Sequence, residues 1–238
     1  MKLNKQGFTL TELLIALGVI GILAAVLMPI IINLLPDQNA LMAKRAYYAT
    51  QTIVSDLINY DSCYPDKTNL TDEDEQRVGF DDGYPTATCP NWTITSSDYG
   101  SDGKLKEGKA NQKFVTLFKE LLDIKQEKGQ SFKTKDGISW KIDDTEGTHS
   151  FSKKKNNAND AYIDIYVDVN GEEKPNRIQG NKEVTIFENK STADTDATKD
   201  FDTFVMRVYA NGKIEIDPDV EDSWAREAVD VSKDVVGK

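Results

Sequence analysis

The sequence is poor in the residues that most enzymes use for catalysis. Its 238 residues include one histidine, His149, and two cysteines, Cys63 and Cys89. No Gly-rich phosphate loop follows a strand pattern, and no nucleophile motif lies near His149. Two cysteines and one distant histidine do not supply the four clustered ligands of a zinc site. We therefore expect neither an enzyme nor a zinc protein.

Basic residues are also scarce, since 29 Lys and Arg stand against 40 Asp and Glu. Residues 13–36 carry no charge at all, and without Lys2, Lys5 and Glu12 the polar remainder holds 27 basic and 39 acidic residues, a net charge of −12. Such a surface repels nucleic-acid phosphate. We expect no direct nucleic-acid partner, and we interpret the short KKK run at residues 153–155 as a solvated loop tip.

The uncharged run near the amino terminus is open to three interpretations. A cleaved secretory signal has an apolar core of about 7–15 residues, and this run is longer. A plain membrane anchor fits better, because 24 helical residues cover about 36 Å against roughly 30 Å of hydrocarbon. Lys2 and Lys5 would keep the amino terminus in the cytoplasm. Neither interpretation accounts for Glu12 or for the Gly-Phe-Thr-Leu before it.

The third interpretation rests on the string KQGFTLTE at residues 5–12, followed by the apolar run. It resembles the class III signal of type IV prepilins and type II secretion pseudopilins. The resemblance covers about the first 36 residues and implies that a prepilin peptidase cuts between Gly7 and Phe8 and methylates Phe8. The mature chain would have 231 residues, because seven of 238 are removed. Copies of the chain or other pilins, membrane lipid and an assembly platform in the inner membrane are the further partners that it implies.

Glu12 gains a role from this resemblance. A carboxylate in the apolar layer costs a few kcal/mol and usually pairs with another group. The resemblance implies that Glu12 of an incoming subunit pairs with the Phe8 amine of a neighbour. The alternative is an acid that snorkels at the cytoplasmic interface.

Within the run, Gly18, Gly21 and Ala25 form one face of small residues, or reflect ordinary enrichment in membrane helices. Pro29 should kink the helix, and its position matches a proline of many pilins. Pro36 indicates a second bend.

The polar part predicts an α+β, pilin-like fold. We expect a helix from Phe8 to about Tyr60, with a transmembrane half at residues 8–36, and an extracytoplasmic domain at residues 37–238. The helix should pack on an antiparallel sheet within residues 135–218. An irregular loop should span residues 61–110, and shorter helices residues 112–126 and 222–238, the last capped by Asp222 or Ser223. Residues 183–187 form a short strand, "NKSTADTDATKD" reads as a polar insertion, and Asn211-Gly212 predicts a type I′ hairpin turn.

Cys63 and Cys89 lie on the polar side of the apolar run, where they can form a disulfide if that side is extracytoplasmic. Closing a loop of 27 residues would stabilise the fold by roughly 3.5 kcal/mol. The alternative is a pair of unpaired, buried thiols.

Oxygen-bearing side chains around Gly171 raise the question of calcium. Asp164, Asp168 and Asn170 are the candidate ligands. The stretch also resembles a module of many prepilin-like proteins, here Asp168, Asn170, Gly171, Pro175, Asn176, Asp202 and Phe204. Major pseudopilins of type II secretion have a calcium-binding loop near the carboxyl end, but their loop sequence is missing here. A strand followed by an Asn-Gly turn, fixed by side-chain to backbone hydrogen bonds, is the favoured alternative.

Two functions remain at this point. The first is a structural subunit of a type IV pilus or a type II secretion-like filament, inserted in the inner membrane with its carboxyl-terminal domain outside the cytoplasm. After assembly it would lie in an extracellular or periplasmic filament. The second is a membrane-anchored extracytoplasmic binding module that never polymerises. The state of the amino terminus distinguishes the two.

Overall fold

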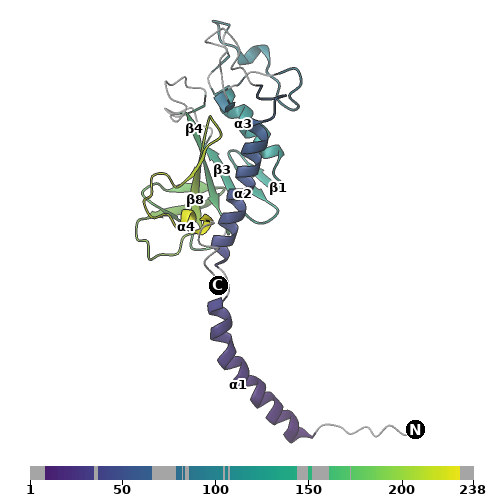
Figure 1. Cartoon of the computed structure of the whole chain (residues 1–238), viewed down its shortest axis with the longest axis vertical. Coiled ribbons are helices and arrows are strands. Elements are labelled where there is room, and N and C mark those ends of the chain that lie inside the picture. The colour runs from purple at the N-terminus through teal and green to yellow at the C-terminus, as the bar shows by residue number, and fades with distance from the viewer. Residues whose placement is uncertain are drawn as a thin grey trace, which may run out of the picture. The chain divides into compact units, whose positions relative to one another are not determined.

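A computed structural model describes residues 9–34, 37–65, 79–81, 83, 86–103, 105–106, 108–143, 150–151, 161–171 and 173–230 (Figure 1). The chain divides into two compact units, Met1–Asp37 and Gln38–Lys238. The first unit holds one apolar helix, and the second combines helices with a large sheet. The predicted α+β class is confirmed.

The helical amino-terminal part consists of two helices, α1 (Leu10–Leu34) and α2 (Gln38–Ile58), where we expected one. Asp37 between them is not helical. A proline disfavours the helical conformation of the residue before it and cannot donate to the preceding turn, which is the reason for the bend predicted at Pro36. Pro36 itself lies outside the described residues. Pro29, in contrast, lies inside α1.

Helix α2 buries one stripe against the rest of its unit. The stripe consists of Ala43, Ala46, Thr50, Ile53, Val54 and Leu57. The spacing of three and four residues is that of one helical face. Leu41, a large apolar residue of the same helix, is 44% exposed, whereas Ala43 and Ala46 are fully buried. The small alanine side chains let the helix approach its neighbours closely. A search for large apolar residues at helical spacing does not find such positions.

In the described residues, nine strands form one curled sheet. Their bounds are β1 (Ile124–Lys128), β2 (Ser131–Thr134), β3 (Ser139–Asp143), β4 (Tyr162–Asp168), β5 (Arg177–Gln179), β6 (Val184–Ile186), β7 (Asn189–Asp194), β8 (Thr203–Tyr209) and β9 (Ile214–Ile216). The order is β1-β2-β3-β4-β8-β5-β7-β6, and β9 pairs with β8. Strand β5 runs parallel to both β7 and β8, so the sheet is mixed and the purely antiparallel prediction was wrong.

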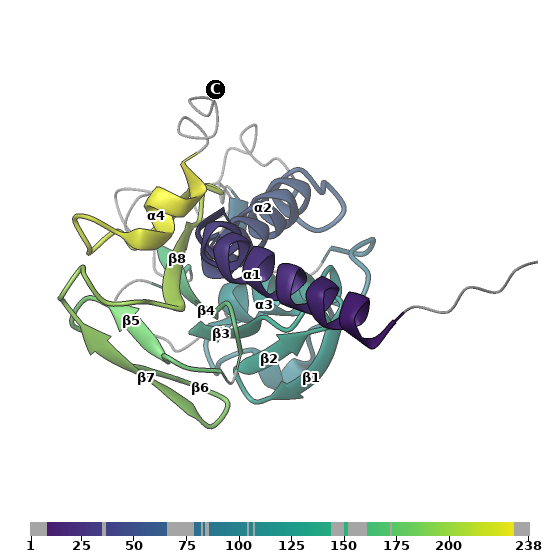
Figure 2. The ribbon, with the colours of Figure 1, turned by 90° about the horizontal axis from the view of Figure 1, so that it is seen from below.

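Contacts between the two ends of the strand order show the curl. Phe187, at the β6–β7 turn, donates its backbone N–H to the Ser131 hydroxyl at 3.2 Å, and Lys128 pairs with Glu188 at 3.0 Å. In Figure 2, β5, β7 and β6 lie on the side of β4 and β8 away from α2. The first and last hairpins of the sheet are therefore neighbours.

Side chains alternate between two cores along β4 and β8. Ile163, Ile165 and Val167 belong to the main core, which α2 and α3 (Lys109–Glu120) share with the sheet. Tyr166 points the other way, into a smaller core with Ile178, Val184 and Ile186. Because successive residues of a strand face opposite sides, Asp164 and Asp168 lie on the side of Tyr166.

Two element predictions were wrong. The helix predicted at residues 112–126 begins at Lys109 and ends at Glu120, and Ile124–Lys128 is strand β1. The polar stretch after residue 188 contains strand β7, in which only Ser191 is buried. In both cases pairing with a neighbouring strand determines the structure, and the sequence of the segment itself carries no apolar alternation.

The predicted hairpin at Asn211-Gly212 is present as β8–β9, but its turn is different. Gly212 has a φ of +83°, whereas Asn211 does not have a positive φ, so a type I′ turn is excluded. Gly212 N–H donates to Tyr209 O at 2.9 Å, and Tyr209 N–H donates to Lys213 O at 2.9 Å. This is a three-residue loop whose left-handed position is a glycine.

The carboxyl-terminal helix α4 (Trp224–Val229) is held by a buried polar group. Ser223 caps the helix by accepting from Arg226 N–H at 3.1 Å, as one of the two predicted caps. The Ser223 hydroxyl donates to Asp217 Oδ2 at 2.6 Å, and Val205 N–H donates to Asp217 Oδ1 at 2.7 Å. Arg226 donates to the carbonyls of Ile216, Asp217, Val220 and Glu221. The predicted extension beyond residue 230 lies outside the described residues.

Burial of Asp217 should make stability depend on pH. Burial raises its pKa to about 6, despite the opposing effects of Ser223, Val205 and Arg226, and Asp219 adds to the rise. The folded chain then binds more protons than the unfolded one between about pH 4 and 6, so its free energy of unfolding falls as pH rises, by about 3 kcal/mol. Relative to Asp217→Asn, wild type should lose most of this free energy of unfolding from pH 4 to 7, as measured by urea unfolding. A difference that stays constant over this range would contradict the assignment.

Candidate functional site

Glu12 forms a reciprocal cap at the start of α1. Its carboxylate Oε2 accepts the backbone N–H and the hydroxyl of Thr9, each at 2.8 Å, and Glu12 N–H donates to Thr9 Oγ1 at 3.3 Å. Thr9 is thus the N-cap and Glu12 the third helical residue of a capping box. The T-x-x-E spacing in the sequence carries this signal, which our sequence reasoning missed.

The described side chains of α1, from Leu10 to Leu27, have no protein packed on them. From Thr9 to Leu27 every side chain is exposed, including Leu10 at 78% and Ile22 at 69%. A helix long and apolar enough to cross a membrane spans Leu10–Leu27. An apolar surface of this size needs lipid or other helices to cover it. No atom lies within 4 Å of a Cβ placed on Gly18 or Gly21, so this face is open to close approach.

Comparison with known families assigns this segment. Residues 2–28 match the model of the prokaryotic N-terminal methylation motif. The chain carries a prepilin-type signal. No curated protein and no solved structure matches the chain. The signal and the apolar helix together make this a pilin-like protein, and the motif implies processing by prepilin peptidase. Gly7 and Phe8 lie outside the described residues.

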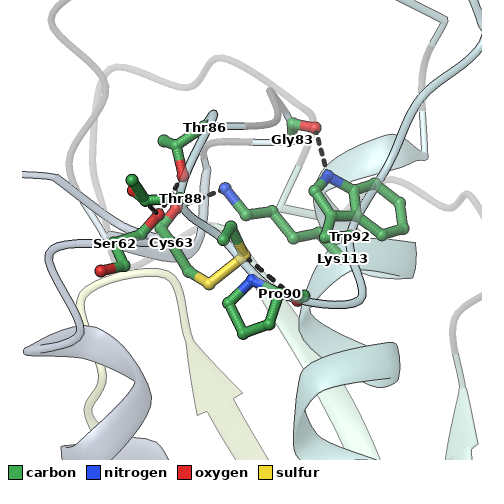
Figure 3. Close-up of a disulfide and its surroundings, with 9 residues drawn as sticks. Ser62, Cys63, Gly83, Thr86, Thr88, Pro90, Trp92 and Lys113 are labelled. Carbon is green, nitrogen blue, oxygen red and sulfur yellow. Dashed lines mark hydrogen bonds between the residues drawn. A yellow bond between two sulfur atoms is a disulfide. The ribbon is translucent and has the colours of Figure 1, made fainter.

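The second unit, Gln38–Lys238, contains the expected disulfide. Cys63 and Cys89 are bonded, with Cα atoms 4.6 Å apart, and the described residues contain no free cysteine. Figure 3 shows the disulfide and the hydrogen bonds of the residues around it. The hydroxyls of Thr86 and Thr88 both donate to Ser62 O, and the Trp92 indole donates to Gly83 O at 3.1 Å. The segment after α2 is therefore tied to the loop that carries Cys89.

A buried lysine reaches the same place from α3. Lys113 is fully buried, its Nζ donates to Cys63 O at 2.5 Å, and the ammonium lies 4.5 Å from the centre of the Tyr64 ring. A buried cation is tolerated only where acceptors or a ring face replace water. Lys113 thus joins α3 to the disulfide segment, a contact that no pattern in the sequence predicts.

A second polar group lies where β4 ends and β8 begins. Asp168 Oδ1 accepts the backbone N–H groups of Asn170 and Gly171, at 3.2 and 2.9 Å. Asp202 Oδ2 accepts the Asn170 side chain at 3.1 Å and Asn176 N–H at 2.6 Å. Two carboxylates and two amides thus meet here, which we name the Asp168 cluster: Asp168, Asn170, Asn176 and Asp202. The Asn-Gly turn that we favoured at residues 168–171 is part of it.

Asp164, the other predicted calcium ligand, belongs to a different group. Its Oδ1 and Oδ2 accept Nε and a terminal nitrogen of Arg207 at 2.9 and 3.2 Å. Four residues of strand place it about 13 Å from Asp168. Asp164 therefore balances the Arg207 charge and is not brought to the Asp168 cluster.

Burial raises the pKa of Asp168 to about 8, and the neighbouring carboxylate of Asp202 adds to the rise. The backbone N–H groups of Gly171 and Asn170 oppose it, and Lys133 on β2 opposes it least. Among the described residues, His, Cys, Asp and Glu do not gather in threes as metal ligands. His149 lies outside the described residues. Any cation held at the Asp168 cluster would thus depend on amide oxygens as well as carboxylates.

Proposed function

We propose that this chain is a structural subunit of a type IV pilus or a type II secretion-like filament. The match of residues 2–28 to the methylation motif carries the proposal. Prepilin peptidase cuts between Gly7 and Phe8, the acidic domain lies outside the cytoplasm, and an inner-membrane platform assembles the chains through α1. The exposed apolar side chains of α1 support this, because neighbouring α1 helices would cover them in a filament.

In this proposal Glu12 has two tasks. Its Oε2 accepts both hydrogen bonds from Thr9, and these bonds stabilise the start of α1 within a single chain. The second carboxylate oxygen would accept the methylated Phe8 amine of a neighbouring subunit. Pairing the carboxylate with an ammonium neutralises two charges that are costly in the apolar layer.

Mass spectrometry of the amino terminus tests the proposal. We expect a chain of 231 residues that begins with methylated Phe8, as seven of the 238 residues are removed. A Gly7→Val variant serves as the control, since it alters only the residue before the cut and should retain residues 1–7. A wild-type chain that keeps Lys2 to Gly7 would instead favour the membrane-anchored binding module.

A further inference from the structure

We propose that neighbouring copies of this chain meet side by side, with an acidic loop of one copy packed against a basic hollow of the next. The acidic loop is residues 218–222, between β9 and α4. The basic hollow lies between α2 and the turn from β2 to β3. Such a contact rests on the proposed filament function and adds to it the surfaces through which the domains of neighbouring copies meet.

Charge is distributed unevenly along the polar part of the chain. Residues 109–141, which contain α3, β1 and β2, hold eight lysines and four acidic residues, a net charge of +4. Residues 142–238 hold 13 basic and 22 acidic residues, a net charge of −9. Copies of so acidic a chain repel each other in most orientations, and attract where the first region of one copy faces the second region of another.

The basic hollow is an apolar depression with a charged rim. Its volume is about 410 Å³, and its floor consists of Ala46, Ala49, Leu122, Ile138 and Trp140. Leu121, next to the floor, is 52% exposed. At the rim, Asp123 pairs with Lys135 at 2.7 Å, and Asp136 accepts the Thr134 hydroxyl. The acidic side chains of the rim are thus already used within the chain.

Two cations at or near the hollow have no acidic partner. Arg45 lies at the rim, and its guanidinium donates to Met42 Sδ at 3.7 Å. Lys125 follows Asp123 by two residues and is exposed. No acidic side chain pairs with either cation in the part of the chain that the structure describes. An uncovered apolar floor beside unpaired cations fits an acidic protein surface.

The acidic loop offers unpaired charge of the opposite sign. The side chains of Glu221 and Asp222 are exposed, and among the described residues no Lys or Arg pairs with their carboxylates. The backbone of the loop is fixed, because Arg226 donates to Glu221 O at 3.0 Å and Gln179 donates to Asp222 O at 2.7 Å. A loop that is ordered before binding loses less entropy when it binds.

Helix α2 separates the two surfaces. Ala46 and Ala49 line the basic hollow, whereas Tyr48 and Gln51 line a groove together with Glu221. Since each residue turns a helix by about 100°, Ala49 and Gln51 point about 160° apart, and they differ by only about 3 Å along the axis. In Figure 1, α4 and β1 accordingly lie on opposite sides of α2. The two surfaces are therefore at one level of the domain but face opposite ways.

Surfaces arranged in this way produce a contact that repeats. Each copy uses its hollow toward one neighbour and its loop toward the other, which is a heterologous contact. Contacts of this kind form rings or open filaments and not closed pairs. The contact would also cover two apolar side chains, Leu121 beside the hollow and Tyr48, which is 41% exposed, beside the loop.

Cross-linking in membranes tests the contact without requiring a filament. A variant with Leu121→Cys and Asp222→Cys has one thiol beside each surface, because the two native cysteines are bonded to each other. With a short bis-maleimide we expect a ladder of dimers, trimers and larger species on denaturing gels. Each single variant has one free thiol and should stop at dimers. A double variant that also gives no species larger than a dimer would overturn the proposal.

Reversed charges in this two-cysteine background identify the ionic contact. Arg45→Glu and Glu221→Lys should each lower the yield of trimers at least tenfold, because like charges then face each other. The two changes together restore opposite charges and should return the yield close to that of the background. A combined variant no better than the single ones would overturn the assignment of these surfaces.

Lys199→Glu is the matched control. It changes the net charge by the same amount as Arg45→Glu, but Lys199 pairs with Asp196 of its own chain at 3.8 Å and lines neither surface among the described residues. It should leave the ladder unchanged. An equal loss of trimers from Lys199→Glu and Arg45→Glu would show an effect of net charge alone and refute the contact.

The amino terminus separates failure of this contact from failure of the filament function. A chain that is cleaved after Gly7 but gives no ladder would retain the proposed function and refute the contact. A ladder from a chain that keeps residues 1–7 would retain the contact and refute the processing.

Discussion

Replacing Glu12 with alanine is expected to abolish incorporation of the chain into filaments, while membrane insertion and cleavage at Gly7–Phe8 continue. Glu12 is the only charged residue between Thr9 and Leu34, so the variant keeps an apolar run that inserts at least as well. It loses the carboxylate that would neutralise the Phe8 amine of a neighbour. A loss of only 1.4 kcal/mol at each subunit addition weakens the equilibrium tenfold. Immunoblots of sheared filaments and membranes, with mass spectrometry of the amino terminus, provide the measurement.

Two further variants separate the charge of Glu12 from its cap. Glu12→Gln keeps a side chain that completes a capping box but has no charge, so it should fail to assemble as Glu12→Ala does. Thr9→Ala keeps the charge and removes the cap, at a cost of about 1 kcal/mol, so assembly should continue at a lower level. Filaments from Glu12→Gln together with none from Thr9→Ala would show that the cap is the essential role. Normal filaments from Glu12→Ala would refute the pairing.

Loss of the disulfide should have the largest effect on the stability of the folded domain. The double variant Cys63→Ala/Cys89→Ala frees a loop closed across a separation of 26 residues, which is expected to cost about 3.5 kcal/mol. For a chain of this size the loss corresponds to a fall in Tm of about 7–14 °C. Thermal unfolding of the full chain in detergent, with and without reductant, measures it.

The reductant supplies the control for this experiment. It should lower the Tm of wild type toward that of the double variant and leave the double variant unchanged, because the described residues contain no other cysteine pair. The hydrogen bonds from Lys113 to the backbone carbonyl of residue 63 and from Thr86 to Ser62 O do not depend on the disulfide. They should still hold the segment after α2 in part, so the domain should remain folded at room temperature. Equal Tm values for wild type and the double variant would contradict the prediction.

Local patterns predicted much of the fold. The apolar stripe of α2, the alternation in β4 and β8, and the glycine at residue 212 are each visible within a few residues. Strands β1 and β7 were missed because their side chains are mostly exposed and polar, and only their partners make them strands. The turn type at Asn211-Gly212 was wrong because the dipeptide is compatible with more than one loop length.

The sequence by itself determined the assignment of the amino-terminal segment. A basic leader, Gly7-Phe8, Glu12 and the apolar run lie within 36 residues, so a short stretch of sequence contains the whole signal. The cap formed by Thr9 and Glu12 is equally local. Membrane entry and processing therefore follow from a motif that needs no tertiary contacts.

Only the tertiary structure decided which oxygens share a site. Asp164 and Asp168 are four residues apart, but the stiff strand between them keeps them about 13 Å apart, and Arg207 on the neighbouring strand pairs with the first. Asp202, 34 residues after Asp168, is brought beside it because β4 pairs with β8, with Asp168 opposite Thr203. Asn176 joins them because Asp202 accepts its backbone N–H. Sequence distance fails here because strand pairing, not chain proximity, sets the distances between side chains.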